Sequence, residues 1–511
     1  MKRTLTLLFA CLFAASTYAA NELKPVVVPP VFKAGFAEQD ITPDIGMEAP
    51  GGYGKSFHKT FHDPCKVRAV VFDDGKKRVA LVGIDLLFVT RHLVLEARAE
   101  IQKRCGIAPD AVMIGASHSH SSGPIGMGEP GDFDKASPLV QELVNEKSIV
   151  TNPGYLQLLK KQIVEAVVQA DANRVDAKLA VGSGHEDKVS FNRRLRMKNG
   201  LSFSHPGAGN PDIIDYAGPI DPEVGTVGVW DLKNNLLGVV VNFSCHATTN
   251  PDGISANWIW SMEKTLRGAT GNAALPVVFM QGACGDITQV DNLTKYQNPG
   301  PEEWCELVGG RVGAEVFKTL LLIRQSAGND IPLDTRQKVW NVKRRVPDPE
   351  KVKHSLELVE QGPAKSGVTE WTFAKEILVL DAILQVRPEV EVEVQAVQVG
   401  PAVFISNPAE YFVQYGLDIK KGSKFPFTFS VELANGIVGY VPTEEAMGPN
   451  GGGYETRLSS YSNLEVSAGR QFADTGIELA NQMTPGTVPV PPPRRPFSAP
   501  WAYGNLPPEL K

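Results

Sequence analysis

Gly238-Val239-Val240-Val241-Asn242-Phe243-Ser244-Cys245 is an apolar, strand-like run that leads directly into His246. Four more apolar runs end in the same way, at polar residues capable of chemistry. They are residues 79–84 before Asp85, 111–117 before His118, 275–280 before the turn that reaches Thr288, and 402–405 before the segment with Glu410. In open α/β sheets, ligands bind beyond the carboxyl ends of the strands. The pattern therefore predicts an α/β fold that gathers histidines and carboxylates at one site, and a bound metal is the simplest chemistry for such a cluster.

Length and charge limit the kind of protein this is. The 511 residues allow two to four domains of roughly 100–200 residues each, although single α/β domains can be longer. The formal net charge of -6 is mild for this size, whereas a protein that chiefly binds nucleic acid normally has a basic surface. We therefore expect no nucleic-acid partner, and the oligomeric state stays open.

The first twenty residues have the pattern of a secretory signal peptide. Lys2-Arg3 is a basic start, residues 5–15 are apolar, and Thr17-Tyr18-Ala19 fits a cleavage site. The alternative is a membrane anchor, but the apolar segment is too short to span a bilayer. No later apolar run is long enough for a transmembrane helix. We therefore expect a periplasmic or secreted protein with no transmembrane segment.

Removal of residues 1–20 leaves five cysteines. Because this number is odd, at least one thiol is free or pairs with another chain. Cys245 and Cys284 flank the proposed site, and the favoured interpretation is that both are buried, inert thiols.

Strand-like and helix-like segments alternate over residues 32–290. Helices are predicted over 92–104 before Gly106, over 155–171, and over 301–325. This alternation indicates an α/β fold with a layered, mixed β-sheet core flanked by helices.

Composition divides the chain into segments. A Val/Pro-rich linker is predicted at 21–31, and a single catalytic domain at 32–483. Residues 338–380 are more charged and are interpreted as a helical excursion over the core. Residues 484–511 are Pro-rich and read as an extended tail.

Two histidine motifs are candidate metal ligands. His118 and His120 would point to one side if the backbone there is extended, because strand side chains alternate. Histidine nitrogens and carboxylates are common zinc ligands. Alone, the motif also fits ordinary polar residues at a strand end, and His246 also fits a half-buried, hydrogen-bonded histidine.

The segment Asn407-Pro408-Ala409-Glu410 matches the start of a helix. Asn407 would be the N-cap, Pro408 the first helical residue, and Glu410 a capping-box residue that hydrogen-bonds back to the Asn407 amide. Spacing alone favours this interpretation over a ligand role. The two roles are compatible, since a carboxylate has two oxygens.

Two further segments could contact a ligand. In the turn after Gly282, Asp286 and Thr288 are placed to orient a ligand or to hydrogen-bond an oxyanion, or the turn simply links a strand to a helix. The basic cluster at 191–196, with Arg193, could recognise an anionic or carbonyl oxygen. Such a cluster is more often a solvated face.

Ten short motifs follow one another along the chain. They are Asp40-Ile41-Thr42-Pro43, Gly52-Tyr53-Gly54, Gly83-Ile84-Asp85, Ser117-His118-Ser119-His120-Ser121, Asn192-Arg193, Cys245-His246-Ala247-Thr248, Gly285-Asp286-Ile287-Thr288, Asn407-Pro408-Ala409-Glu410, Tyr440-Val441-Pro442-Thr443-Glu444-Glu445 and Tyr454-Glu455. In this order they resemble the neutral, non-lysosomal ceramidases and their bacterial relatives. The resemblance covers about residues 32–483.

The resemblance implies a zinc site. Its ligands would be His118, His246, Glu410 and Tyr440, which changes the interpretation of Glu410 from helix cap to ligand. Nothing in the local pattern of Tyr440 indicates this role. The resemblance also implies that His120 lies next to the ligands or transfers a proton. Arg193 and Tyr454 would help to hold the carbonyl or head group of the substrate.

The sequence departs from the family in two places. Ceramidases carry serine where this chain has Thr288, which makes a nucleophilic role there less favoured. Family members also continue into a C-terminal sandwich domain, whereas a Pro-rich tail follows here, and this favours substrates other than ceramide itself. We expect Asp85 to be a structural carboxylate or to contact the residues that bind the ligand.

Three functions are consistent with these motifs. The first is a secreted zinc-dependent hydrolase of an N-acyl amide bond, ceramide-like by resemblance. In this hypothesis, Thr288 and Arg193 stabilise the oxyanion, Asp286 orients the ligand and His120 protonates the leaving amine. The second is an ester or amino-sugar amide hydrolase on the same scaffold. The third is a non-catalytic extracellular binding protein. The expected partner is a small-molecule or lipid substrate, with transient contact to a membrane surface.

Overall fold

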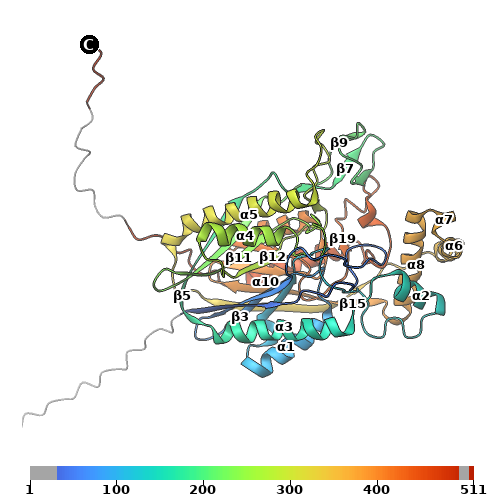
Figure 1. Ribbon diagram of the computed structural model, residues 1–511, viewed down its shortest axis with the longest axis horizontal. Coiled ribbons are helices and arrows are strands. Elements are labelled where there is room, and N and C mark those ends of the chain that lie inside the picture. The colour runs from blue at the N-terminus through green and yellow to red at the C-terminus, as the bar shows by residue number, and fades with distance from the viewer. Residues whose placement is uncertain (1–31, 494–505) are drawn as a thin grey trace, which may run out of the picture. The chain divides into compact units, whose positions relative to one another are not determined.

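Eight strands form one mixed sheet in the order β12-β11-β10-β5-β1-β2-β3-β4. In the computed structural model (Figure 1) they are β1 Lys33–Asp40, β2 Lys66–Asp73, β3 Arg78–Ile84, β4 Val112–Ala116, β5 Val175–His185, β10 Glu223–Asp231, β11 Leu236–Phe243 and β12 Val277–Gln281. The structure describes residues 32–493 and 506–511. The predicted signal peptide, the linker at 21–31 and part of the tail lie outside these residues.

The large sheet folds over so that its two ends meet. Neighbouring strands are antiparallel except β3–β4 and β11–β12, which are parallel. The edge strand β12 also packs against β2, β3 and β4, which are not its neighbours in the sheet. At the crossing, a Cβ on Gly83 would lie 2.2 Å from the carbonyl oxygen of Phe279, so only glycine allows this approach. The carboxyl ends of β4 and β11 are thereby brought together.

A second, four-stranded sheet contains β14 Leu333–Lys343, β15 Glu389–Val399, β16 Ala402–Ser406 and β18 Phe427–Val431. Two short pairs carry site residues. One joins β6 Phe191–Asn192 to β13 Ile287–Thr288, and the other joins β17 Glu410–Tyr411 to β19 Tyr440–Val441. A small three-stranded sheet contains β7 Arg194–Met197, β8 Ser202–Ser204 and β9 Ile213–Tyr216.

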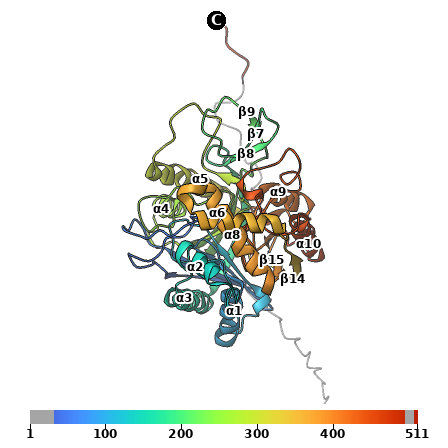
Figure 2. The same cartoon turned by 90° about the vertical axis from the view of Figure 1, so that its right-hand side faces the viewer.

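Helices cover both sheets and extend to one side. α3 Pro153–Ala172 packs on β1 and β2 and carries α1 Arg91–Cys105, while α4 Trp258–Thr270 packs against α5 Pro301–Ile323, which lies on β5 and β10. α9 Val413–Gly422 and α10 Ala468–Gln482 cover the second sheet. α2 Pro138–Lys147, α6 Pro349–Gln361, α7 Pro363–Ser366 and α8 Val368–Val386 form a separate cluster (Figure 2).

The three helices predicted at 92–104, 155–171 and 301–325 are confirmed as α1, α3 and α5, and Gly106 adopts the left-handed C-cap conformation after α1. The five strand-like runs are confirmed as β3, β4, β11, β12 and β16. The helical excursion at 338–380 is wrong at its start. Residues up to Lys343 belong to β14, which pairs with β15 along its whole length. Residues 337–339, 341 and 343 of β14 are exposed, so both faces of the strand meet solvent there, which explains why this segment resembled a surface helix.

All five cysteines among the described residues are free. Cys245 and Cys284 are buried, and burial raises the pKa of both thiols. The prediction of buried, inert thiols is therefore confirmed, because a protonated thiol is a poor nucleophile and metal ligand. Within the described residues, no helix is long and apolar enough to cross a membrane.

Candidate functional site

His118 follows the end of β4 and adopts a left-handed conformation, with φ of 64°. The extended backbone predicted for the His118-Ser119-His120 segment is therefore wrong. The left-handed turn nevertheless brings the two imidazoles together, with 3.2 Å between their Nε2 atoms. His118 Nδ1 lies 2.8 Å from the carbonyl oxygen of Leu87. Because a carbonyl only accepts, Nδ1 carries the proton and Nε2 keeps a free lone pair.

His246 follows the end of β11 and is held in the same way. Its Nδ1 donates to the carbonyl oxygen of Cys284 at 2.7 Å, and this again leaves the lone pair on Nε2. The ring of His246 stands at 82° to that of His118, with 4.5 Å between the ring centres. Histidines that bind metals commonly show this arrangement, in which one nitrogen binds a backbone carbonyl and the other faces the ion.

Glu410 lies in β17 and not in a helix. Its amide donates to the carbonyl of Gly439, and α9 begins only at Val413, so the predicted capping box is wrong. Pairing with β19 extends the backbone and excludes the helical turn that a cap requires. The register places Glu410 beside Tyr440, so both side chains leave the same face.

The carboxylate of Glu410 meets both histidines. Its Oε2 lies 3.3 Å from His118 Nε2 and 3.5 Å from His246 Nε2. Two ligands about 2.0–2.1 Å from a tetrahedral zinc lie about 3.3 Å from each other. Oε2 is buried and has no hydrogen-bond partner among the described residues. The donor set, its spacing and this unsatisfied oxygen therefore fit a zinc ion. His118, His120 and His246 also form a group whose nitrogens lie within 4.8 Å of one another.

Arg193 and two tyrosines form one side of the cluster. Arg193 Nη1 lies 3.2 Å from His246 Nε2, and its Nη2 donates to the hydroxyl of Tyr440 at 3.2 Å. The hydroxyls of Tyr440 and Tyr454 are 3.0 Å apart. Glu455 fixes the guanidinium from behind, since its Oε1 accepts from Arg193 Nε at 2.8 Å. Arg193 is thus buried beside the cluster, not on a solvated face.

The side chains of Asp286 and Thr288 bond to residues outside the cluster, while their segment meets it through the backbone, since the amide of His246 donates to the carbonyl of Ile287. Both oxygens of the Asp286 carboxylate are occupied, one by the amide of Val413 and the other by the side chain of Asn192. Its carbonyl accepts from the amide of Arg193, so Asp286 supports the Arg193 strand, and its direct role stays a prediction. The hydroxyl of Thr288 donates to Gln289 Oε1 at 3.0 Å.

The charges of the cluster favour metal binding. Burial, together with the positive charges of Arg193 and His118, lowers the pKa of His246 to about 3. Burial, His118 and His246 hold the pKa of His120 well below its usual range. Burial opposes the charge on His118, but the Glu410 carboxylate outweighs it and raises the pKa of His118. Neutral imidazole is the form that ligates metals, and the Glu410 carboxylate would balance the charge of a bound cation.

A cavity of about 100 Å³ opens beside the cluster. Its lining includes His118, His120, Glu410, Tyr440 and Tyr454, together with Gly51, Gly52, Tyr53, Leu87, Phe88, Ile125, Gly126, Met127, Ile149 and Tyr461. Sequence reasoning assigned no role to Tyr53 or Tyr461. The Gly52-Tyr53-Gly54 motif was a signal for the first, whereas the second has none.

Glu432 is a further residue that the sequence did not reveal. Its carboxylate is buried and accepts from the amides of Cys284 and Tyr411, at 2.9 and 2.8 Å. Cys284 supplies the carbonyl that orients His246, and Tyr411 follows Glu410. Glu432 therefore joins the loop that orients His246 to the strand that carries Glu410, and the Cys284 thiol also donates to its Oε1 at 2.8 Å. Asp85, by contrast, lies in a buried ion pair with Arg68 at 2.7 Å.

No protein-family model matches the chain. The sequence is 27% identical over 288 residues to neutral ceramidase from Pseudomonas aeruginosa, which covers 53% of this chain and 39% of that protein. The chain thus spans well under two thirds of the length of the curated relative that it matches.

Two solved structures share the fold. One is the crystal structure of neutral ceramidase from Pseudomonas aeruginosa, with a TM-score of 0.65 and 18% identity over 91% of this chain and 76% of that chain. The other is a ceramidase complexed with C2, with a TM-score of 0.62 and 17% identity over 91% and 77%. The resemblance that the motif order predicted is confirmed, and so is the mixed α/β fold class.

Proposed function

Because the chain resembles neutral ceramidases in sequence and in fold, we propose that it is a zinc-dependent hydrolase of N-acyl amide bonds, with ceramide-like lipids as the substrate class. One observation carries this proposal. The Oε2 atom of Glu410 lies 3.3 Å from His118 Nε2 and 3.5 Å from His246 Nε2, close to the separation of two ligands on one zinc, and it has no hydrogen-bond partner among the described residues.

His118, His246 and Glu410 would hold the zinc, with the hydroxyl of Tyr440 as the fourth ligand. Zinc bound there would supply Lewis-acid chemistry, because it polarises a carbonyl and lowers the pKa of water to about 7. The protein supplies the positions of these groups through Leu87, Cys284 and the β17–β19 pair.

The remaining residues of the site have distinct roles in this proposal. Tyr454 lines the cavity and is fixed by Tyr440, so its hydroxyl can donate to the carbonyl oxygen of a bound amide. Arg193 adds positive charge beside Tyr454, next to the place proposed for that carbonyl oxygen. His120 lines the cavity, and its lowered pKa keeps the imidazole neutral, so it could take a proton from the attacking water and then pass it to the leaving amine. The hydroxyl of Thr288 bonds to Gln289, and no step is assigned to it in this proposal.

His246→Ala tests the proposal. We expect the purified variant to lose its bound zinc, measured by elemental analysis, and its amide hydrolysis together. His354→Ala, which removes an exposed histidine on α6, is the matched control and should keep both. A His246→Ala protein that is metal-free and fully active would refute the proposal. A substrate panel of ceramides, simpler N-acyl amines, esters and acetylated amino sugars would then identify the bond.

We also propose that the protein is exported, on the signal-peptide pattern of residues 1–20. N-terminal sequencing of the protein recovered from cell fractions tests this. A mature chain that begins at residue 20 or 21 in the periplasm or medium supports export, whereas a cytoplasmic chain that still begins at Met1 contradicts it.

A further inference from the structure

A second and larger cavity, of about 450 Å³, lies beside the one at the cluster. Met127, Ile149 and Tyr461 line both cavities, so the two adjoin each other. The second cavity is enclosed by α8, the start of α1 and the first residues of β15. Its volume falls in the range of small-molecule sites, about 300–1,000 Å³. Nothing in the proposed chemistry uses it.

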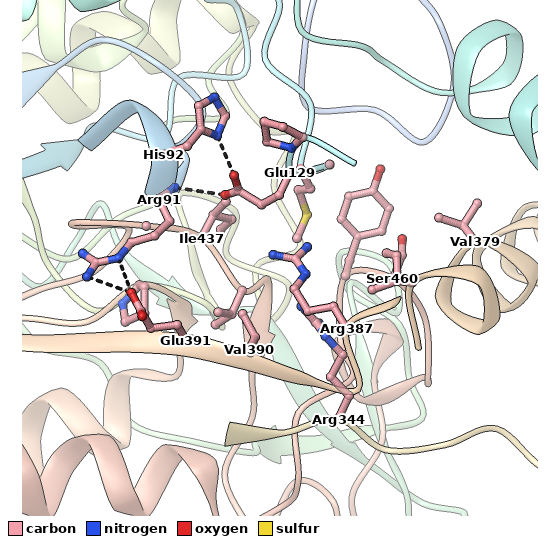
Figure 3. A pocket seen from close by; sticks show the side chains of 18 of the residues that line it. Arg91, His92, Glu129, Arg344, Val379, Arg387, Val390, Glu391, Ile437 and Ser460 are labelled. Atoms are coloured by element: carbon pink, nitrogen blue, oxygen red, sulfur yellow. Dashed lines mark hydrogen bonds and ion pairs between the residues drawn. The ribbon is translucent and has the colours of Figure 1, made fainter. Parts of the chain in front are cut away.

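The walls of this cavity are largely apolar, with charged groups at defined places (Figure 3). The apolar side chains come from several elements and include Leu95, Met127, Phe133, Ile383, Val390 and Ile437. A hydrocarbon segment would therefore be well accommodated. The charged groups of the lining determine which charge such a ligand can carry beside its hydrocarbon segment.

Each carboxylate that lines the cavity already has a cationic partner. Their pairs are Glu129 with His92, Glu376 with Lys375, Glu391 with Arg91, and Glu393 with Arg91 and Arg98. Of these carboxylates, Glu376 has a buried Oε1 without a hydrogen-bond partner among the described residues, but this oxygen lies 2.9 Å from the ammonium group of Lys375. The negative charge of this wall is thus already balanced by the protein.

Two neighbouring arginines complete the lining, and Figure 3 shows Arg344 and Arg387 on the same side of the cavity, opposite His92 and Glu129. Arg387 donates to Asp132 at 2.6 Å. Arg344 donates to the amide oxygen of Asn463, and among the described residues it has no ion pair.

The positive charge at this place is incompletely compensated. The Nε atoms of Arg344 and Arg387 are both buried, and neither has an acceptor among the described residues. Burial and the charge of Arg387 lower the pKa of Arg344 to about 10, so Arg344 is still protonated at neutral pH. Guanidinium groups bind oxyanions through planar, charge-assisted hydrogen bonds.

We propose that this second cavity binds an oxyanion, a carboxylate or a sulfonate, at the end of an apolar segment, with Arg344 as the residue that selects for it. For its biological ligand, the inference rests on the proposed hydrolase function. Since the two cavities adjoin, the oxyanion belongs to an amide whose carbonyl lies at the cluster. The preferred substrate is then an anionic amphiphilic amide rather than a neutral ceramide.

Binding tests the oxyanion site without any turnover. Calorimetry on the full-length purified protein compares dodecanesulfonate with neutral dodecanol, and we expect the sulfonate to bind at least about tenfold more tightly. Arg344→Gln should abolish this difference, whereas Arg344→Lys, which keeps the charge, should retain part of it. Lys343→Gln removes one exposed charge from the neighbouring position of β14 and should change nothing. Thermal melting of each variant shows whether it is folded.

Turnover then shows which half of the substrate carries the charge. The amide of dodecanoic acid with aminohexanoate carries a carboxylate on the amine half, and the amide with aminohexanol is its neutral match. The hexylamide of dodecanedioic acid carries the carboxylate on the acyl half instead. We expect one of the two anionic amides to have a kcat/KM at least about tenfold above the neutral one, and Arg344→Gln to remove this advantage.

The outcomes separate the two proposals. If the sulfonate preference depends on Arg344 but no amide is cleaved, the hydrolase function is wrong and the oxyanion site stands. If amides are cleaved, but neither the sulfonate in calorimetry nor the anionic amides in turnover show a preference that depends on Arg344, the oxyanion site is wrong and the hydrolase function stands. A preference that survives Arg344→Gln in a folded variant also overturns the inference.

Discussion

Gly51 determines where the ring of His120 lies. A Cβ at this position would be 2.2 Å from His120 Nδ1, and the φ of Gly51 is +93°. A side chain here would therefore push the imidazole out of the cavity and strain the backbone. The Gly52-Tyr53-Gly54 motif marks this loop in the sequence, but a contact across so many residues is visible only in the folded chain.

We expect Gly51→Ala to lower kcat by tenfold or more while the zinc content stays unchanged, because His120 moves and the ligands do not. Gly46→Ala is the matched control. Gly46 has a nearly identical φ of +91°, and a Cβ there meets nothing within 4 Å. Both variants should lose about 1–3 kcal/mol of stability from backbone strain, and only Gly51→Ala should lose activity. Equal activities would contradict this role of Gly51.

Glu432 makes the stability of the loops around the cluster depend on pH. Burial raises its pKa from 4.5 to about 8. Between these values the folded protein holds a proton that the unfolded chain has released. The stability contributed by this group is therefore complete below about pH 4.5 and is lost as the pH rises to about 8.

Glu432→Gln should flatten this part of the pH dependence, because glutamine resembles the protonated acid at every pH. We expect the melting temperature of the variant, relative to the wild type, to rise between pH 5 and pH 8. The corresponding change in the free energy of unfolding is up to a few kcal/mol. Melting curves at several pH values measure it. Parallel curves for the two proteins would show that Glu432 is ionised in the folded state.

At this scale the sequence identified the histidines and missed the groups that orient them. His118 and His246 could be predicted because each follows a strong apolar run. Tyr440 was found by resemblance alone, since its neighbour Glu410 in the paired strand is thirty residues away along the chain. Glu432 and Tyr461 act through contacts that have no local pattern, so only the fold reveals them.

At the scale of elements, a buried ion cluster joins β2, the end of β3 and α4. Arg68 on β2 donates to Asp85 at 2.7 Å and to Glu263 on α4 at 2.8 Å, and all three are buried. Removal of one member of such a cluster leaves the others charged and unpaired, which is costly.

Arg68→Met should therefore destabilise the protein by about 3–5 kcal/mol, measured by chemical denaturation. Lys76→Met, at an exposed position in the turn before β3, is the control and should change the free energy of unfolding by less than about 0.5 kcal/mol. A small effect of Arg68→Met would mean that Asp85 and Glu263 take up protons when Arg68 is lost, and stability would then fall as the pH rises.

Helices and strands were predicted well where the local sequence pattern determines their conformation. They were predicted poorly where pairing with a strand distant in the sequence determines it. The apolar strands and the three amphipathic helices have local patterns. The segment that starts with Asn407-Pro408 has the local pattern of a helix start, yet β19 pairs with it and holds it extended. In β14 the exposed charges resemble those of a helix, and pairing with β15 overrides them.

At the scale of the whole molecule, the proposed zinc joins segments that are far apart in the sequence. His118 and His246 follow strands of the large sheet, and Glu410 and Tyr440 belong to the β17–β19 pair. An ion that binds only the folded chain stabilises all of it, by about 4 kcal/mol when its concentration is a thousand times Kd.

Chelation should thus lower the melting temperature of the entire protein by several degrees, as a single transition, and added zinc should restore it. Calorimetric scans before and after treatment with EDTA measure this. The His246→Ala protein is the control, since its melting temperature should not respond to either addition. If the wild type is equally unresponsive, the cluster holds no zinc that matters for folding.

The wide separation of the four ligands along the chain also bears on biosynthesis. No short segment of the nascent polypeptide contains two of the proposed ligands His118, His246 and Glu410, so the proposed ion would be captured only once the sheets have assembled. Nitrogen and oxygen donors of this kind bind several divalent ions, and supply strongly influences which is bound. The metal held by the proposed site would therefore depend on the ions available where folding is completed, and the same polypeptide refolded in a different buffer would acquire a different one.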